Sequence, residues 1–197
     1  MEWIEALDES LFWWINGHHS TSLDWIMWTF SQSWSWFVAV VLFYLLITLR
    51  KDSKNWLWIL LGIALCFLLA DQISTNAIKD GVQRLRPCYE FSGVRMFHTG
   101  KGGLYGFVSS HAANAFAIAM FMSLAYGGRK KEGGYRNIAI PFIAFGWAFV
   151  VGYSRPYLGK HYPGDVVCGA LLGLGVGAVV YFVICKIRLW ISSRSSA

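Results

Sequence analysis

Apolar residues occur along this chain in long runs, which short polar segments separate. A helix that crosses a bilayer needs about 20 predominantly apolar residues, and five runs approach or exceed that length. They predict membrane-spanning helices over 23–49, 56–78, 112–126, 138–153 and 166–184. The pattern therefore indicates an all-α protein that crosses a membrane several times.

Residues 3–16 have a different pattern, with apolar and acidic side chains on separate faces of a helix. The apolar positions are Ile4, Leu7, Leu11 and Trp14, and the acidic ones are Glu2, Glu5 and Glu9. This segment is too short to span, so we expect an amphipathic helix in the interface, with a sixth span as the alternative. The predicted fold is a polytopic membrane helical bundle with five to six transmembrane helices and an N-terminal amphipathic helix.

The composition supports a membrane environment. Hydrophobic residues make up 56% of the 197 residues and charged residues 14%, with a mean hydropathy of +0.45. That is too little charge to cover a soluble domain, and eleven Trp residues fit interfacial aromatic belts. No Pro- or Ser-rich linker divides the chain, so we expect residues 1–197 to form one domain. The four cysteines do not form a disulfide framework, and early acidic residues argue against a cleavable signal peptide.

The basic residues predict the orientation of the bundle. Ten of the 17 Lys and Arg residues lie within 50–54, 129–136 and 186–194, which five spans place on one side. The positive-inside rule makes that side cytoplasmic, together with the C-terminus. The other seven fall on the outer side: Lys79, Arg84, Arg86, Arg95, Lys101, Arg155 and Lys160. Cations gathered against the rule are suited to balance a bound anion, although short loops also tolerate some positive charge.

Two features within the spans have structural interpretations. Gly169, Gly173 and Gly177 are four residues apart and lie on nearly one helical face, where small residues let helices pack closely in lipid. Asp71 lies within a span, where an ionisable group is costly and often functional. It either pairs with a basic group near a site or hydrogen-bonds to polar neighbours such as Thr75, and we favour the structural interpretation.

Three clusters on the predicted outer side carry residues suited to chemistry. The first reads K-D-G-V-Q-R-L-R-P over 79–87. Lys79 and Arg86 are seven residues apart, so they project from one face of a continuous helix, which we expect Pro87 to end. Two cations on one face can clamp a phosphate, but an ordinary basic flank of a span has the same pattern.

The second cluster reads F-V-S-S-H over 107–111, immediately before an apolar helix. Ser109 or Ser110 is suited to cap that helix, and the free N–H groups at a helix start bind anions. His111 then lies in the first turn, beside a bound anion, although a lone His is as often structural.

The third cluster reads S-R-P-Y-L-G-K-H-Y-P-G-D over 154–165. It combines the guanidinium of Arg155, the imidazole of His161 and the carboxylate of Asp165 in one outer loop. A carboxylate four residues after a His can hold its Nδ1–H and leave Nε2 free as a nucleophile or base. Pro163 and Gly164 predict a turn into the last span.

These clusters resemble the three signature motifs of the type 2 phosphatidic acid phosphatase superfamily, which are K-x6-R-P, P-S-G-H and S-R-x5-H-x3-D. The first and third match completely, through Lys79, Arg86 and Pro87 and through Ser154, Arg155, His161 and Asp165. In the second, Val108 replaces Pro and Ser110 replaces Gly, while Ser109 and His111 are kept. This departure bears on the rigidity of the loop more than on its chemistry.

The resemblance implies a phosphatase that uses no metal ion or other cofactor. His161 would attack phosphorus to give a phosphohistidine while Asp165 holds its ring, and His111 would protonate the leaving oxygen and later activate water. The groups expected to hold the phosphate oxygens are Lys79, Arg86, Ser109, Ser110 and Arg155. The outer loops lack a carboxylate cluster suited to Mg²⁺.

The resemblance also limits the substrate to a lipid phosphate in a bilayer, with no nucleic-acid partner. Bacterial relatives act on undecaprenyl diphosphate, phosphatidylglycerophosphate, phosphatidic acid or lipid A phosphates. An outward-facing site in the bacterial cytoplasmic membrane favours recycling of a carrier lipid, so undecaprenyl diphosphate is our first expectation and the others are alternatives. Two other classes are weaker: vanadium haloperoxidases are soluble, and a phospholipid-binding or transport protein would need neither His111 nor the spacing of His161 and Asp165.

Overall fold

The computed structural model describes residues 2–32, 34, 36, 41, 56–127 and 138–195, and every named element among them is a helix. In chain order these are α1 (Glu2–Gly17), α2 (Thr21–Ser31), α4 (Trp56–Gln72), the π-helix η2 (Ile73–Lys79), α5 (Asp80–Val82), α6 (Pro87–Glu90), α7 (Ser110–Tyr126), α8 (Ala139–Tyr157) and α9 (Pro163–Ser195). The all-α prediction is therefore confirmed for the described part of the chain.

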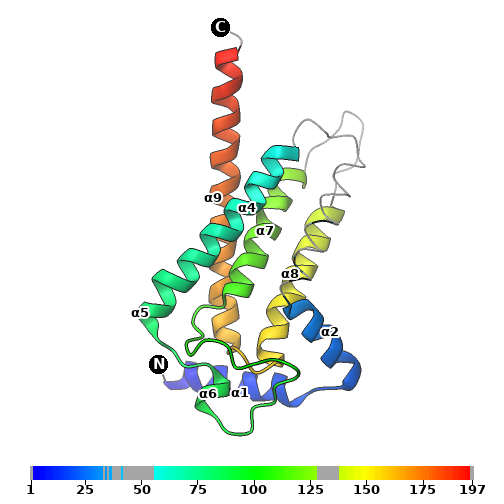
Figure 1. The fold of residues 1–197 in the computed structure, drawn as a ribbon, viewed down its shortest axis with the longest axis vertical. Helices are drawn as coiled ribbons and strands as arrows, with labels where there is room; N and C mark the ends of the chain where they lie inside the picture. Colours follow the sequence, from blue (N-terminus) through cyan, green and yellow to red (C-terminus); the bar gives the residue numbers. More distant parts are fainter. Residues whose placement is uncertain are drawn as a thin grey trace.

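The longer helices form a bundle. Helices α4, α7, α8 and α9 run side by side, and the C-terminal part of α9 extends past the others (Figure 1). Helix α1 crosses the end away from the C-terminus, where α5, α6 and the described loops around them also lie (Figure 1). All three sequence clusters thus meet at this end, as their predicted common side of the membrane required.

Within the described part of the chain, two helical segments are long and apolar enough to cross a membrane, Trp56–Val82 and Pro163–Arg194. Helices α7 and α8 agree in position with two further predicted spans, while the total of five or six stays a prediction. The run from residue 23 is not one uninterrupted helix, because α2 ends at Ser31 and Gln32 is extended, with φ −85° and ψ 143°. Most of the rest of that run lies outside the described residues.

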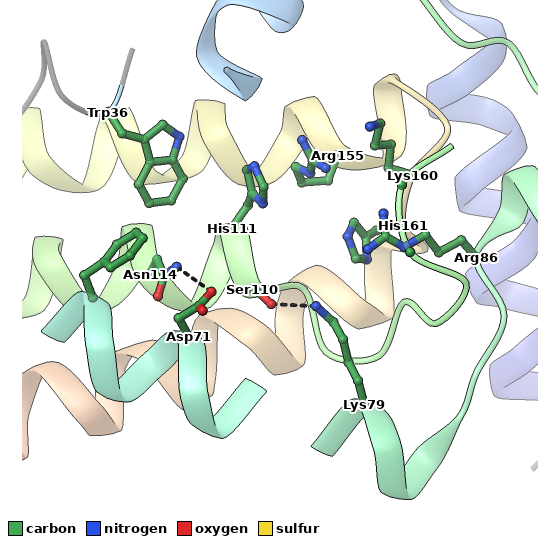
Figure 2. Close-up of a pocket in the computed structure, with 13 residues that line it drawn as sticks. Trp36, Asp71, Lys79, Arg86, Ser110, His111, Asn114, Arg155, Lys160 and His161 are labelled. Carbon is green, nitrogen blue, oxygen red and sulfur yellow. Dashed lines mark hydrogen bonds between the residues drawn. The ribbon is translucent and has the colours of Figure 1, made fainter. Parts of the chain in front are cut away.

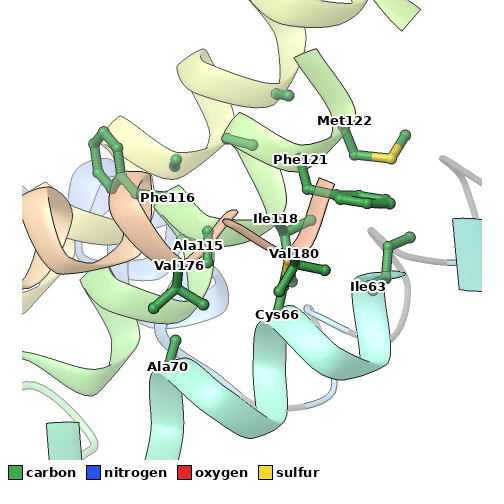
Figure 3. Packing of buried hydrophobic residues seen from close by; sticks show 14 of the residues in the cluster. Ile63, Cys66, Ala70, Ala115, Phe116, Ile118, Phe121, Met122, Val176 and Val180 are labelled. Atoms are coloured by element: carbon green, nitrogen blue, oxygen red, sulfur yellow. The ribbon is translucent and has the colours of Figure 1, made fainter. Parts of the chain in front are cut away.

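Helix α7 is the centre of the bundle, since 11 of its 17 residues are buried. It is rich in Ala, so neighbouring helices approach its backbone closely. Figure 3 shows how Phe121 and other α7 side chains pack against Cys66 of α4 and Val180 of α9. A Cβ on Gly62 of α4 would collide with the Phe121 ring, so this glycine makes room for a buried aromatic side chain of α7.

The glycine stripe of α9 forms the closest of these contacts. A Cβ on Gly173 or Gly177 would lie well inside van der Waals contact with the carbonyl oxygens of Ala113 or Ala117, and one on Gly169 would meet the carbonyl of Ser109. The predicted structural role of the stripe is therefore confirmed. It fixes the start of α7 beside the start of α9.

Helix α1 presents its apolar residues outward. Trp3, Ile4, Leu7, Leu11 and Trp14 are each at least 44% exposed. Its buried side is small and consists of Phe12 and Asn16, of which Asn16 donates to the Tyr157 carbonyl at 2.9 Å. Glu2, Glu5 and Glu9 are exposed as well, so the amphipathic character of this segment and its position in the membrane interface stay predictions.

The close seam between α7 and α9 predicts a sharp contrast between two glycines of α9. We expect Gly173→Ala to lower the free energy of unfolding by about 1–3 kcal/mol, because its methyl group collides with the α7 backbone. Gly175→Ala should leave stability unchanged or slightly raised, since nothing lies within 4 Å of its Cβ position. Thermal unfolding in detergent measures both, and equal melting temperatures for the two variants would contradict the seam.

Candidate active site

A cavity of about 470 Å³ lies where the loops meet the bundle. Figure 2 shows the residues that line it, which come from α4, η2, α7, α8 and three connecting segments, together with Trp36. Six of the residues predicted from the sequence line this cavity: Lys79, Arg86, Ser110, His111, Arg155 and His161. The fold therefore brings together positions that are up to 82 residues apart in the chain.

Lys79 reaches the cavity from the end of the π-helix η2. Its Nζ donates to the Ser110 hydroxyl at 2.6 Å, and the hydroxyls of Ser74 and Thr75 lie 2.9 and 3.3 Å from the same oxygen. Wide turns of this kind interrupt α-helices most often at functional sites. Here the π-helix brings the side chains of Ser74, Thr75 and Lys79 to the first turn of α7.

Arg86 reaches the cavity by another route than predicted. The helix ends at Val82, Gln83 is left-handed with φ 53°, and Arg86 is extended. The prediction that Lys79 and Arg86 share one helical face is therefore wrong, and Pro87 begins α6 rather than ending a helix. The loop still points Arg86 inward, because its Nε donates to the Tyr105 carbonyl at 3.1 Å.

The two serines of the second cluster have different positions and roles. Ser109 is the N-cap of α7, where its hydroxyl accepts a hydrogen bond from Ala112 N–H at 3.4 Å. It is fully buried and is not among the residues that line the cavity, so Ser110 is the hydroxyl that faces the cavity. His111 lies in the first turn, as predicted, with its ring edge-on to Trp36 at 5.5 Å between centroids.

Arg155 lies in the last turn of α8 and is only 3% exposed. One of its terminal nitrogens donates to the Ser31 hydroxyl, while its Nε has no hydrogen-bond partner within the described part of the chain. It also forms no ion pair with a described carboxylate. A buried guanidinium in this state is suited to bind an anionic ligand.

His161 and Asp165 are both buried and lie close together, as their spacing predicted. The His161 Nδ1 and Asp165 Oδ2 atoms are 3.4 Å apart, but their geometry is not that of a hydrogen bond and Nδ1 has no other partner among the described residues. Asp165 Oδ2 accepts instead from Tyr162 N–H at 3.0 Å. The structure thus places the two side chains side by side without the expected hydrogen bond.

Sequence reasoning missed the residues that support the Asp165 carboxylate through Oδ1, its oxygen on the side away from the His161 ring. Arg84 donates to Asp165 Oδ1 at 3.0 Å and pairs with Asp8 of α1 at 2.9 Å, and Asp8 also accepts from Gly164 N–H at 2.6 Å. The sequence identifies Arg84 only as one of the outer cations, because no spacing links it to Asp8, 76 residues earlier. Lys160, which precedes His161 and lines the cavity, is likewise identified from the sequence only as an outer cation, with no role assigned to it.

The cations change the chemistry of the loop residues. Burial, followed by the charges of Arg155, Arg86 and Lys79, lowers the pKa of His161 well below its usual range. The pKa of Lys160 falls to about 8 through burial and the charges of Arg155 and Arg86. His161 is therefore a neutral imidazole at pH 7, in a cavity whose crowded positive charge favours an anion.

Comparison with known proteins connects this geometry to a family. A sequence model of the PAP2 superfamily matches residues 56–188. The lipid A 4'-phosphatase of Bacteroides thetaiotaomicron is 34% identical, over 98% of this chain and 84% of its own length. The lipid A 4'-phosphatase of Porphyromonas gingivalis is 30% identical, over 98% of this chain and 78% of its own length.

Solved structures agree with the family match. The crystal structure of LpxE from Aquifex aeolicus is 28% identical, with a TM-score of 0.61 over 88% of this chain and 94% of that chain. A PAP2-type phosphatidylglycerolphosphate phosphatase from Bacillus subtilis shares the fold, with a TM-score of 0.64 over 97% and 89% of the two chains and 21% identity. This chain belongs to the PAP2 superfamily and is a membrane lipid phosphatase.

Proposed function

We propose that this protein removes a phosphate group from lipid A through a phosphohistidine intermediate. The observation that carries the proposal is the similarity to two lipid A 4'-phosphatases over 98% of the chain. Undecaprenyl diphosphate, the first expectation from the sequence, has no such support, and the lipid A alternative replaces it. We further propose that residues 1–197 form one membrane-embedded phosphatase domain.

The proposed nucleophile is His161, since a neutral imidazole has a free lone pair to attack phosphorus. Asp165, 3.4 Å away, orients the ring and stabilises the positive charge that develops on it. His111 lies in the same cavity and is proposed to protonate the departing lipid oxygen. It then takes a proton from the water that hydrolyses the phosphohistidine.

The phosphate oxygens are proposed to bind Lys79, Arg86, Arg155 and the hydroxyl of Ser110, all of which face the cavity. Ser109 contributes by capping α7, whose first N–H groups are open to an anion. These donors are already in place without substrate, so they stabilise the transition state with little reorganisation.

No metal ion is required in this proposal. Lys79, Arg86 and Arg155 carry the charge that Mg²⁺ supplies in other phosphatases. The described residues include no group of three or more His, Cys, Asp or Glu side chains placed to hold a metal. We propose that the active site faces the extracytoplasmic side of a bacterial cytoplasmic membrane, with several spans and a cytoplasmic C-terminus. The basic segments at 50–54, 129–136 and 186–194 support this orientation.

The mechanism predicts complete dependence on His161 and none on metal. In detergent, phosphate release from a lipid A 4'-phosphate should continue in the presence of a chelator. His161→Ala should lower kcat by at least about 10⁴-fold, because the nucleophile is lost. His19→Ala, which changes an exposed His, serves as the control. Strict dependence on Mg²⁺, or full activity in His161→Ala, would refute the mechanism.

The contact of Arg84 with Asp165 predicts a second, smaller effect. Arg84→Gln and Asp8→Asn should each lower kcat about 10–100-fold, with little change in KM, because Asp165 loses its support but the phosphate contacts remain. The double variant should be little worse than either single one, since both remove the same support. Glu2→Gln, an exposed acidic residue of the same helix, is the control, and fully additive losses would show that the two residues act separately.

A further inference from the structure

The two ends of the active-site cavity differ in chemistry. In Figure 2, Arg86, Lys160 and His161 lie at one end, while Trp36, Asp71 and Asn114 lie at the other. His111 and Ser110 are in between. The phosphate-binding groups occupy the first end and the middle, so the mechanism described above leaves the Asp71 end without a role.

Polar groups at this end are incompletely paired. Asn114 Nδ2 donates to Asp71 Oδ1 at a long 3.5 Å. Asn114 is only 4% exposed, and its Oδ1 has no hydrogen-bond partner among the described residues. A buried carbonyl oxygen without a donor is costly, and this one belongs to a residue that lines the cavity. Together with the Asp71 carboxylate, it forms a set of acceptors for hydroxyl or amide N–H groups of a ligand.

Aromatic rings form the wall beside these acceptors. Trp36 packs edge-on against His111 on one side and against Phe67 on the other, with centroid distances of 5.5 and 6.4 Å. Both Trp36 and Phe67 line the cavity. An apolar wall with a few directed acceptors suits a compact ring that carries hydroxyl or amide groups.

The direction of the reaction connects this end to the leaving group. In-line displacement puts the departing oxygen opposite the attacking nitrogen of His161, and the proposed acid His111 lies between His161 and the Asp71 end. The lipid alcohol that leaves therefore occupies the end lined by Asp71 and Asn114. There a carboxylate accepts hydrogen bonds from an uncharged alcohol but repels a second phosphate.

We infer that Asp71 and Asn114 form a leaving-group subsite that binds an uncharged, hydroxylated or amide-bearing ring and excludes a diphosphate. This inference rests on the proposed function and deepens it, because it makes Asp71 a determinant of specificity for a sugar monophosphate over an isoprenoid diphosphate. It also gives Asp71 a role beyond the structural one expected from the sequence.

The test compares kcat/KM for a lipid A 4'-phosphate and for undecaprenyl diphosphate, in detergent, across four proteins. The ratio of interest is kcat/KM for the lipid A 4'-phosphate divided by kcat/KM for the diphosphate. We expect Asp71→Asn, which keeps the size but removes the charge, to lower this ratio at least about tenfold, with a rise in absolute activity on the diphosphate. Asp71→Glu restores the charge and should keep the ratio nearer that of the wild type. Asp80→Asn removes an exposed carboxylate outside the cavity and should change neither value.

Each outcome separates the subsite from the function on which it rests. A parallel loss on both substrates in Asp71→Asn, or an unchanged ratio, would overturn the subsite and leave the lipid A proposal standing. A wild-type protein that prefers the diphosphate would overturn the proposed substrate, and the subsite with it. A loss of activity that Asp71→Glu fails to restore, with melting temperatures lowered in both variants, would show a structural role only and also overturn the subsite.

Discussion

The active site depends on the mutual repulsion of cations whose charge the described carboxylates of the chain do not fully balance. Lys79, Arg86, Arg155 and Lys160 face one cavity, in surroundings where like charges interact more strongly than in water. The chain pairs Arg84 with Asp8 and Asp165, yet Arg155 has no carboxylate partner among the described residues. A phosphate dianion relieves this repulsion, and so the folded state is prepared for its substrate. Burial, followed by the charges of these cations, lowers the pKa of His161 and so favours the neutral, nucleophilic imidazole.

The charged side chains keep their positions because small residues let two helices pack closely and rigidly beneath them. The close seam of α7 and α9 puts Ser109 and Asp165 beside each other, and Ser109 N–H donates to the Asp165 carbonyl at 3.0 Å. The first turn of α7, which carries Ser110 and His111, is thereby fixed against the start of α9, which follows His161. Helix α1 adds a second anchor through Asp8 and Gly164.

The sequence predicted most of the site residues because the chemistry fixes their types and their spacing within each cluster. It also identified Ser109 as one of two candidate caps and predicted the structural role of the glycine stripe, since both follow from local helix rules. It was wrong where a local rule was extended too far: seven residues suggested one helical face for Lys79 and Arg86, but Gln83 adopts a left-handed conformation and the chain leaves the helix. It could not find the Asp8–Arg84–Asp165 chain or the Asp71–Asn114 pair, because these contacts join distant segments and have no periodicity. The three motifs do not specify the lipid: undecaprenyl diphosphate was expected from the predicted orientation alone, and the similarity to lipid A 4'-phosphatases favours the lipid A alternative instead.

The central claim is that phosphate passes through a covalent bond to His161, and trapping the intermediate tests it most directly. A lipid A 4'-phosphate labelled in its phosphate group is mixed rapidly with the wild-type protein, and the reaction is stopped during the first turnover in alkali, in which phosphohistidine survives. Our account predicts that the label is bound to the protein at this stage and that mass spectrometry assigns it to His161, while the His161→Ala variant takes up no label. Label on Ser110 or another residue, or turnover by the wild-type protein with no labelled protein at any time, would contradict it.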